Sequence, residues 1–311
     1  MEKPKLNIKI LSEKEQKAKI EELRRRVRMD PVANKLLLLS PDYELVFKNS
    51  YIPLINYLED KKICEGCKGF SHCPKLGRKG FKIKLSNNYY SLNLEQRYVP
   101  CKYYSEILNV LNNIIFSDID KWEIYFYSNA SKEIIKSKPS KVKNSFIFVS
   151  KMCLLKTTQY SKSDMNRGYM IYSDNHNGEA IGYLLAYAFA RKGNTVSLIN
   201  AQTTLNKCSS LIEDVKKEGE RDLILAKSAD IMIINNLGFE YKSQAARDLI
   251  LTPLFRDRAR RGKMTFISSF LDYSDILKMY SRDQVSYKIF KQIIDKIVEP
   301  IEVKDLEYFN D

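Results

Sequence analysis

The 311-residue sequence lacks any apolar run close to the roughly 20 residues that a membrane-spanning helix needs. Its first residues also lack the apolar core of a signal peptide, so we expect a cytoplasmic protein. Only 11 glycines and 9 prolines occur, which excludes collagen-like and proline-rich scaffolds. Large side chains are not scarce, because 20 Tyr and 14 Phe are present, and this excludes a disordered polymer. The length favours two globular domains.

Acidic residues are fewer than basic ones. The sequence contains 52 Lys and Arg and 38 Asp and Glu, which gives a net charge of +14. Such an excess indicates contact with a polyanion or an acidic protein surface, or simply solvated lysine-rich faces. Residues 1–130 hold 23 basic and 16 acidic residues, and the remainder of the chain carries the same excess of seven. Neither half of the chain is therefore a basic arm.

The pattern along the chain predicts two domains of different character. Helical spacing and small cysteine-containing segments occupy residues 1–127, and a Ser-, Lys- and Asn-rich stretch at 128–145 is the best linker candidate. From about residue 168, short apolar strands alternate with helices, and residues 231–234 form an entirely apolar strand. This order predicts an α/β fold in residues 146–311, a parallel sheet covered by helices.

Four cysteines form the strongest local motif, Cys64-x2-Cys67-x5-Cys73 followed 28 residues later by Cys101. In a cytosolic chain this spacing favours thiolate ligation of a structural zinc ion over disulfides. His72 lies next to Cys73 and could replace it as a ligand. The alternative is a set of buried or redox-active thiols. The two other cysteines, at positions 153 and 208, lie in apolar or helical contexts and are expected in the core.

A phosphate-binding loop belongs between the strand near residue 172 and the helix that follows, and its motif there is G-x-x-x-x-G-K-[ST]. Counting back from the helix, we place Gly178 in the loop and Ala180 at the last glycine position. Ile181 then takes the place of the lysine and Gly182 that of the Ser or Thr. The segment would offer neither an ammonium group for the phosphates nor a hydroxyl for magnesium.

The third strand of a P-loop ATPase ends in an aspartate that holds magnesium, often beside a second carboxylate. Here the strand at 231–234 runs into Asn235 and Asn236, and an amide cannot act as a general base. Two separate losses at one site argue against ATP hydrolysis more strongly than either loss alone. The plain alternative is an ordinary α/β domain that never bound a nucleotide.

These residues resemble the DnaI-type primosomal helicase loaders over nearly the whole chain. Phe270 occupies the position of the family's sensor residue, and Lys288 lies in the segment that matches the family's arginine-finger helix. The other segments that carry the resemblance are the cysteine motif at 64–101, the helix at 183–190, the strand at 229–238, and residues 246–248 and 265–270.

The resemblance implies a P-loop AAA+-like parallel-sheet domain preceded by a small helical zinc-binding domain. It implies Zn²⁺ as a cofactor, whereas the departures at each catalytic position argue against ATP and Mg²⁺ turnover. It further implies the replicative hexameric DNA helicase as a partner of residues 1–127, together with single-stranded DNA and other primosome proteins. No membrane contact is implied.

The densest basic stretch of the sequence is a candidate DNA-binding segment. It lies at the end of a long predicted helix, where cations also favour the helix dipole, so a solvated face is the competing interpretation. Its candidate residues are Arg256, Arg258, Arg260, Arg261 and Lys263.

Three functions are compatible with the sequence. The first is an adaptor that binds helicase and helps to load it without efficient ATP hydrolysis. The second is an active AAA+ ATPase loader with a non-standard pocket, completed by Lys or Arg of a neighbouring subunit. The third is a zinc-containing DNA-binding protein that has no helicase partner.

Overall fold

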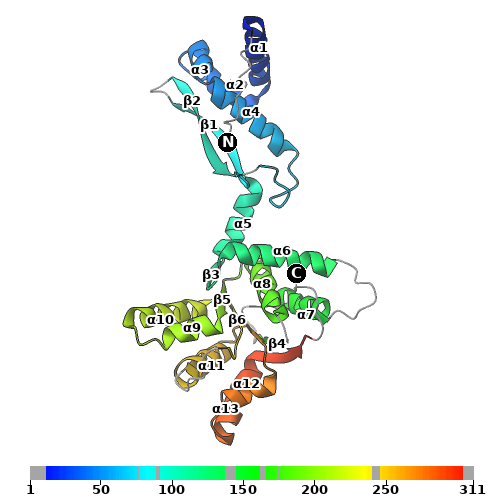
Figure 1. Cartoon of the computed structure of the whole chain (residues 1–311), viewed down its shortest axis with the longest axis vertical. Helices are drawn as coiled ribbons and strands as arrows, with labels where there is room; N and C mark the ends of the chain where they lie inside the picture. Colours follow the sequence, from blue (N-terminus) through cyan, green and yellow to red (C-terminus); the bar gives the residue numbers. More distant parts are fainter. Residues whose placement is uncertain are drawn as a thin grey trace, which may run out of the picture. The chain divides into compact units, whose positions relative to one another are not determined.

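The computed structural model describes residues 12–75, 77–88, 92–136, 145–161, 166–173, 176–239 and 246–303. The chain divides into two compact units, Met1–Ile107 and Leu108–Asp311, whose elements are labelled in Figure 1. Each unit has its own cluster of buried hydrophobic side chains. None of the described helices is both long and apolar enough to cross a membrane.

The first unit combines short helices with a β-hairpin. Ser12 and Glu15 form the predicted capping box of α1, and the Asp30 carboxylate caps α2 by accepting from the backbone of Val32 and Ala33. Its elements are α1 (Glu13–Met29), α2 (Pro31–Leu38), α3 (Tyr43–Asn49), α4 (Tyr51–Glu65), β1 (Phe81–Asn88), β2 (Asn93–Pro100) and the start of α5 (Lys102–Asn112).

The core of the first unit lies between its helices and one face of the hairpin. Strands β1 and β2 pair antiparallel, with Ile83 opposite Tyr98 and Lys84 opposite Arg97. Ile83 and Leu85 point into the core because alternate strand residues share a face. They pack with Leu54 of α4 and with side chains from α1, α2 and α3. The hydrophobic core of this unit is thus independent of the cysteines.

The second unit contains a six-stranded parallel sheet in the order β3-β5-β6-β7-β4-β8. The central strands are apolar and almost wholly buried, as expected of a sheet covered on both faces. This confirms the predicted fold class, an α/β domain with a parallel sheet covered by helices. Its strands are β3 (Ile114–Ser117), β4 (Gly168–Tyr172), β5 (Val196–Asn200), β6 (Ile231–Asn235), β7 (Thr265–Ser269) and β8 (Val298–Glu302).

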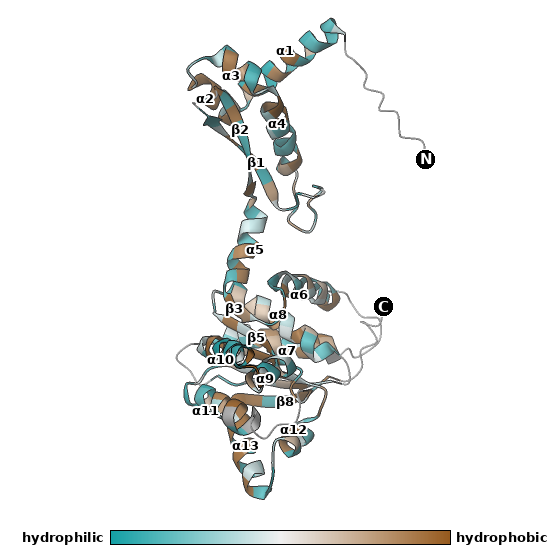
Figure 2. Ribbon diagram, turned by 60° about the vertical axis from the view of Figure 1, so that its left-hand side comes forward, coloured by the Kyte–Doolittle hydropathy of each residue, from teal (hydrophilic) through white to brown (hydrophobic). Residues whose placement is uncertain are grey.

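Helices cover both faces of this sheet (Figures 1 and 2). The largely exposed helix α10 is mostly teal in Figure 2, because charged residues dominate its sequence. The helical elements of the unit are α6 (Lys121–Lys136), α7 (Ser145–Gln159), α8 (Asn177–Arg191), α9 (Ala201–Cys208), α10 (Glu213–Ser228), the π-helix η1 (Ala246–Leu251), α11 (Thr252–Arg260), α12 (Tyr273–Met279) and α13 (Gln284–Ile297).

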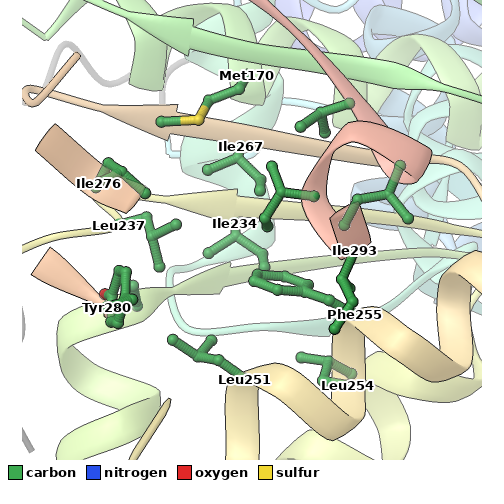
Figure 3. Close-up of a cluster of buried hydrophobic side chains, with 14 of the residues drawn as sticks. Met170, Ile234, Leu237, Leu251, Leu254, Phe255, Ile267, Ile276, Tyr280 and Ile293 are labelled. Atoms are coloured by element: carbon green, nitrogen blue, oxygen red, sulfur yellow. The ribbon is translucent and has the colours of Figure 1, made fainter. Parts of the chain in front are cut away.

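The two faces of the sheet use alternate strand residues. Met170, Ile234 and Ile267 point toward η1, α11, α12 and α13, where they meet Leu251 and Phe255 (Figure 3). The intervening residues face α8, whose Ile181, Leu184 and Leu185 are fully buried. Helix α8 is therefore the central helix of the opposite layer.

The domain boundary lies earlier in the chain than the sequence pattern indicates. Residues 128–136 belong to α6, which packs on α8, and only 137–144 of the predicted linker lie outside the described residues. Ser128 and Ser131 are buried in this packing, so residues that read as a polar linker are interior residues of a helix. Strand β3 also joins the sheet of the second unit, although its sequence precedes the predicted linker.

Candidate functional site

The candidate site lies at the carboxyl ends of the parallel strands, beside β4. The chain leaves β4 for β5 on one side of the sheet, whereas β8 pairs with β4 on the other side. Such a change of direction marks the place where α/β sheets bind ligands. The start of α8 and the ends of β6 and β7 converge there.

The structure corrects the register of the predicted phosphate loop. Helix α8 begins at Asn177, and the eight residues that directly follow β4 are 173–180. A strand–GxxxxGK[ST]–helix arrangement then places Gly178 at the second glycine, Glu179 at the lysine and Ala180 at the Ser or Thr. In this register Ile181 and Gly182, which the sequence pattern places at the lysine and hydroxyl positions, are both buried in the second turn of α8.

The glycines of α8 serve close packing against the sheet. A Cβ on Gly178 would lie 3.0 Å from Ser268 Cβ and 3.4 Å from the Ile171 carbonyl oxygen. A Cβ on Gly182 would lie 2.5 Å from Asn235 Oδ1, closer than any ordinary contact. The helix can approach β6 and β7 this closely only because these positions have no side chain.

Glu179 reverses the charge that a phosphate site requires. Its carboxylate accepts from Tyr183 Oη and lies 3.2 Å from His176 Nδ1, and its side chain is 20% exposed. None of the described Lys or Arg residues forms an ion pair with it. A carboxylate in the first turn is favourable for the helix dipole, so the position is locally stable. It would repel phosphate oxygens where a lysine would attract them.

The end of β6 supplies amides in a fixed arrangement. Ser268 Oγ donates to Asn235 Oδ1 at 3.1 Å, and Asn235 is only 2% exposed. Asn236 adopts a left-handed backbone conformation with φ of 60°, and its N–H donates to Ser268 Oγ at 3.3 Å. Asn tolerates this conformation better than most residues. Asn235 and Asn236, at the positions where carboxylates are expected, are thus held in place by hydrogen bonds with Ser268.

Aromatic rings line the mouth of the site. Phe270, which follows β7, meets His176 edge-on at 5.4 Å between ring centroids and Phe239 at 4.7 Å. These contacts place an apolar ring at the expected sensor position, where it can offer no hydrogen bond to a phosphate. Lys288 lies on the exposed side of α13, which packs on α11, α12 and β8.

Asp118, just after β3, is a polar residue of this edge that the sequence pattern did not single out. Burial raises the pKa of Asp118, although hydrogen bonds from the Asn200 N–H at 2.7 Å and from Thr204 Oγ1 at 2.8 Å oppose the rise. Asp118, Glu179 and Asn235 line a cavity of about 10 Å³, close to the smallest space that holds one water. The only signal of Asp118 in the sequence is its place directly after a short apolar run.

The residues of this site do not fit ATP with magnesium. The lysine position holds a carboxylate, the hydroxyl position holds Ala180, and the magnesium-binding strand end holds Asn235. Each of these changes removes a charge or ligand that phosphoryl transfer needs. The described residues of this site therefore lack the phosphate-binding chemistry of a P-loop.

The predicted zinc ligands lie at one end of the first unit. Cys64 is near the end of α4, the Cys67 carbonyl accepts from Tyr103 Oη at 3.4 Å, and the Cys101 N–H donates to the Gly80 carbonyl at 2.8 Å. No three His, Cys, Asp or Glu side chains among the described residues form a metal-ligand group. Lys75 Nζ instead lies 3.0 Å from Cys64 Sγ. The cysteine side chains are thus not arranged as a closed tetrahedral site.

Cys153 and Cys208 are buried, as their apolar contexts predict. Burial raises the pKa of the Cys153 thiol to about 12 and that of the Cys208 thiol to about 11. Both are therefore uncharged thiols at neutral pH, and they pack as small hydrophobic side chains.

The residues of the predicted DNA-binding stretch differ in exposure to solvent. Arg258 is 0% exposed, so it cannot contact DNA, and the prediction for this residue is wrong. Lys263 Nζ donates to the Ser228 carbonyl at 2.5 Å and to the Ala229 carbonyl at 3.1 Å. Arg260 and Arg261 are exposed but pair with Asp257, each at 3.1 Å. Arg256 is exposed as well.

Comparisons with known proteins find structural likeness only. No family model matches the chain, and no curated protein sequence matches it. A candidate primosome component from Streptococcus pyogenes serotype M3 is 14% identical, with a TM-score of 0.49 over 64% of this chain and 97% of that one. The DnaI structure is 14% identical, with a TM-score of 0.48 over 64% and 98% of the chains. The DnaC helicase loader is 15% identical, with a TM-score of 0.44 over 58% and 99%. These values are too low to carry a functional argument.

Proposed function

We propose that this protein binds the replicative hexameric DNA helicase and helps to load it onto single-stranded DNA during initiation or restart of replication, without efficient ATP hydrolysis. The observation that carries the proposal is the position of Glu179. An α/β unit of the P-loop kind holds a carboxylate where phosphate binding requires a cation. Such a unit can serve as a binding scaffold rather than as a catalyst.

The first unit supports a role in protein binding. Large apolar side chains on its surface are exposed at Leu38 (68%), Leu39 (60%) and Ile52 (69%). A groove of about 800 Å³ between α1 and α3 in the same unit is lined by apolar Ile20 and Leu45 together with charged side chains. Exposed apolar surface of this kind is typical of protein-interaction sites. We assign helicase binding to this unit, with other primosome proteins as further candidates.

Zinc belongs to the proposal as a structural ion. The spacing of Cys64, Cys67, Cys73 and Cys101, and their position at one end of the unit, support it. Binding would require the thiols to turn toward a common centre, and Cys64 to exchange its contact with Lys75 for the metal. Four protein ligands would leave no open position for catalysis.

The two other functions would each require something different of this protein. An active ATPase with a non-standard pocket would need a partner to supply the cation that Glu179 replaces. A zinc-containing DNA-binding protein would use neither the apolar surface of the first unit nor a helicase. Direct measurement of ATP turnover and helicase binding separates all three.

The deciding experiment measures ATP binding and hydrolysis by the purified protein, with and without the helicase hexamer, and retention of the protein on the immobilised hexamer. We expect retention on the hexamer and no ATP turnover by the protein itself. The double variant Glu179→Lys, Ala180→Ser should remain inactive, because Asn235 and Asn236 still lack a carboxylate. Turnover that requires the protein would establish the ATPase function. Failure to bind the hexamer, with strong DNA binding, would establish the third function.

A further inference from the structure

The positive charge of the chain is concentrated in one segment of the first unit. Residues 61–104 contain ten Lys and Arg residues and only two Glu residues, a net charge of +8 in 44 positions. The rest of the first 130 residues contains thirteen basic and fourteen acidic residues. The equal excess in the two halves of the chain therefore conceals a strongly basic patch around the β1–β2 hairpin.

Most of these cations form no ion pair within the described part of the chain. Four of the ten pair with carboxylates: Lys61 with Asp30, Lys75 with Asp60, Arg97 with Glu95 and Lys102 with Glu106. The other six form no ion pair with any described residue, and all six are exposed. This basic patch comprises Lys62, Lys68, Arg78, Lys79, Lys82 and Lys84.

The hairpin places like charges side by side. Lys84 lies directly opposite Arg97 in the register, and Lys82 lies two residues along the same face of β1. Cross-strand neighbours are about 5 Å apart, and like charges there are destabilising. Glu95 lies 3.5 Å from Arg97, but this pair is largely exposed and stabilises little. A bound polyanion would remove the repulsion.

Aromatic rings, one of them exposed, accompany two of the cations. The Arg78 guanidinium lies 4.9 Å above the ring of Tyr98, which is 46% exposed, and the Lys79 ammonium lies 5.0 Å from the ring of Phe70. Cations beside exposed rings match the requirements of single-stranded nucleic acid, whose phosphates need positive charge and whose bases need stacking surfaces. An acidic protein segment would use only the charges.

We infer that the β1–β2 hairpin and its basic patch bind single-stranded DNA through the phosphate backbone. Tyr98, which shares a face with Ile83 rather than with Lys82 and Lys84, would serve as a stacking surface for a base at the Arg78 end of the hairpin. The inference rests on the proposed function, because it names where that function's DNA ligand binds. It transfers the DNA contact from α11, where Asp257 neutralises Arg260 and Arg261, to a surface of the first unit. The basic patch has no comparable internal carboxylates.

The test measures binding of a fluorescent dT oligonucleotide to the full-length protein at several salt concentrations. The variant Lys82→Gln, Lys84→Gln removes two cations and also relieves the repulsion with Arg97, so its fold should be preserved. A matched control, Lys14→Gln, Lys17→Gln, removes the same charge from the exposed side of α1. Retention on the helicase hexamer is measured for each protein.

We expect the hairpin variant to bind roughly 25-fold more weakly at 0.1 M salt, because each phosphate contact contributes about 0.7 to the slope of log affinity against log salt. That slope should fall by about 1.4. The control should keep the parent affinity, and all three proteins should bind helicase. Tyr98→Leu should weaken oligonucleotide binding by about five-fold or more while binding to polyglutamate, a purely charged competitor, stays unchanged.

Equal losses in the hairpin variant and the control would overturn the inference, since total charge alone would then govern binding. Unchanged DNA affinity with lost helicase binding would identify the hairpin as a protein-docking face and would equally overturn it. Absence of oligonucleotide binding by the parent at low salt would refute it as well. Helicase binding that persists in that case would leave the helicase part of the proposed function standing.

Discussion

At the scale of single residues, Arg258 shows how burial changes the meaning of a charged side chain. It is fully buried at the end of α11, where its Nε donates to Thr265 Oγ1 at 2.8 Å. Its two terminal nitrogens donate to the carbonyls of Ala229 at 3.1 Å and Met264 at 2.6 Å, among others. Burial lowers the pKa of the guanidinium, yet its hydrogen bonds join α11 to the starts of β6 and β7.

The hydrogen bonds of Arg258 should contribute strongly to the stability of the second unit. Arg258→Met should lower the free energy of unfolding by about 3–5 kcal/mol, because several buried carbonyls lose their donor and methionine cannot replace it. Arg256→Met, two residues earlier on the exposed side of the helix, should change it by less than about 0.5 kcal/mol. Urea unfolding monitored by circular dichroism measures both values. Equal small changes would contradict the assigned role.

At the scale of secondary structure elements, the break between α1 and α2 depends on one carboxylate. Asp30 is 5% exposed and accepts from the N–H groups of Val32 at 3.0 Å and Ala33 at 2.8 Å. The same carboxylate accepts from Lys61 Nζ of α4 at 2.5 Å. Burial raises its pKa, but the hydrogen bonds from Ala33 and Lys61 outweigh burial, and the net pKa is lowered.

A pH-dependent prediction follows from this lowered pKa. Asp30→Ala should destabilise the first unit by about 2 kcal/mol at pH 7, since the helix cap and the contact with Lys61 are both lost. A carboxylate whose pKa is lowered on folding stabilises above its unfolded value near 3.8, and this contribution disappears as the pH falls below that value. Asp30→Asn keeps the cap and should lose less. Thermal unfolding at pH 7 and pH 3 should therefore show the difference from the parent shrinking in acid. A constant difference would contradict the linkage.

At the scale of the whole molecule, two units with separate cores carry separate tasks. The first unit presents apolar surface and the basic patch, whereas the second holds a parallel sheet with Glu179 in the first turn of α8 beside its strand ends. Zinc, if bound, would act only on the first unit, because all four candidate cysteines lie in it.

The prediction at this scale is a metal content of about one zinc per chain, bound by the four thiolates. Removing it with a strong chelator should lower the unfolding temperature of the first unit and leave that of the second unchanged. Atomic absorption and differential scanning calorimetry measure these quantities. Cys64→Ser should lose the metal, whereas Cys153→Ser should keep it. A fully folded protein without zinc would refute the metal site and leave the hydrophobic core as the source of stability.

Much of the fold could be predicted because its signals are local. The capping box at Ser12, the apolar strands at β4, β5, β6 and β7, and the alternation of strands and helices all involve neighbouring residues. The start of α8 at Asn177 is hard to find in the sequence, because Asn177 and Gly178 are polar or small and resemble a loop. Counting from this start places the phosphate motif two residues earlier and puts Glu179 at the lysine position. Likewise the polar sequence of residues 128–136 concealed a helix whose serines pack inward.

The sequence by itself determined the α/β class, the cysteine spacing and the net charge. Only the tertiary structure decided which residue occupies the lysine position, that Arg258 is interior, that β3 joins the sheet, and which cations lack carboxylate partners. The physical reason is that propensity and periodicity act between near neighbours. Burial and charge pairing depend on contacts between segments far apart in the chain, such as Lys61 with Asp30 or Gly182 with Asn235.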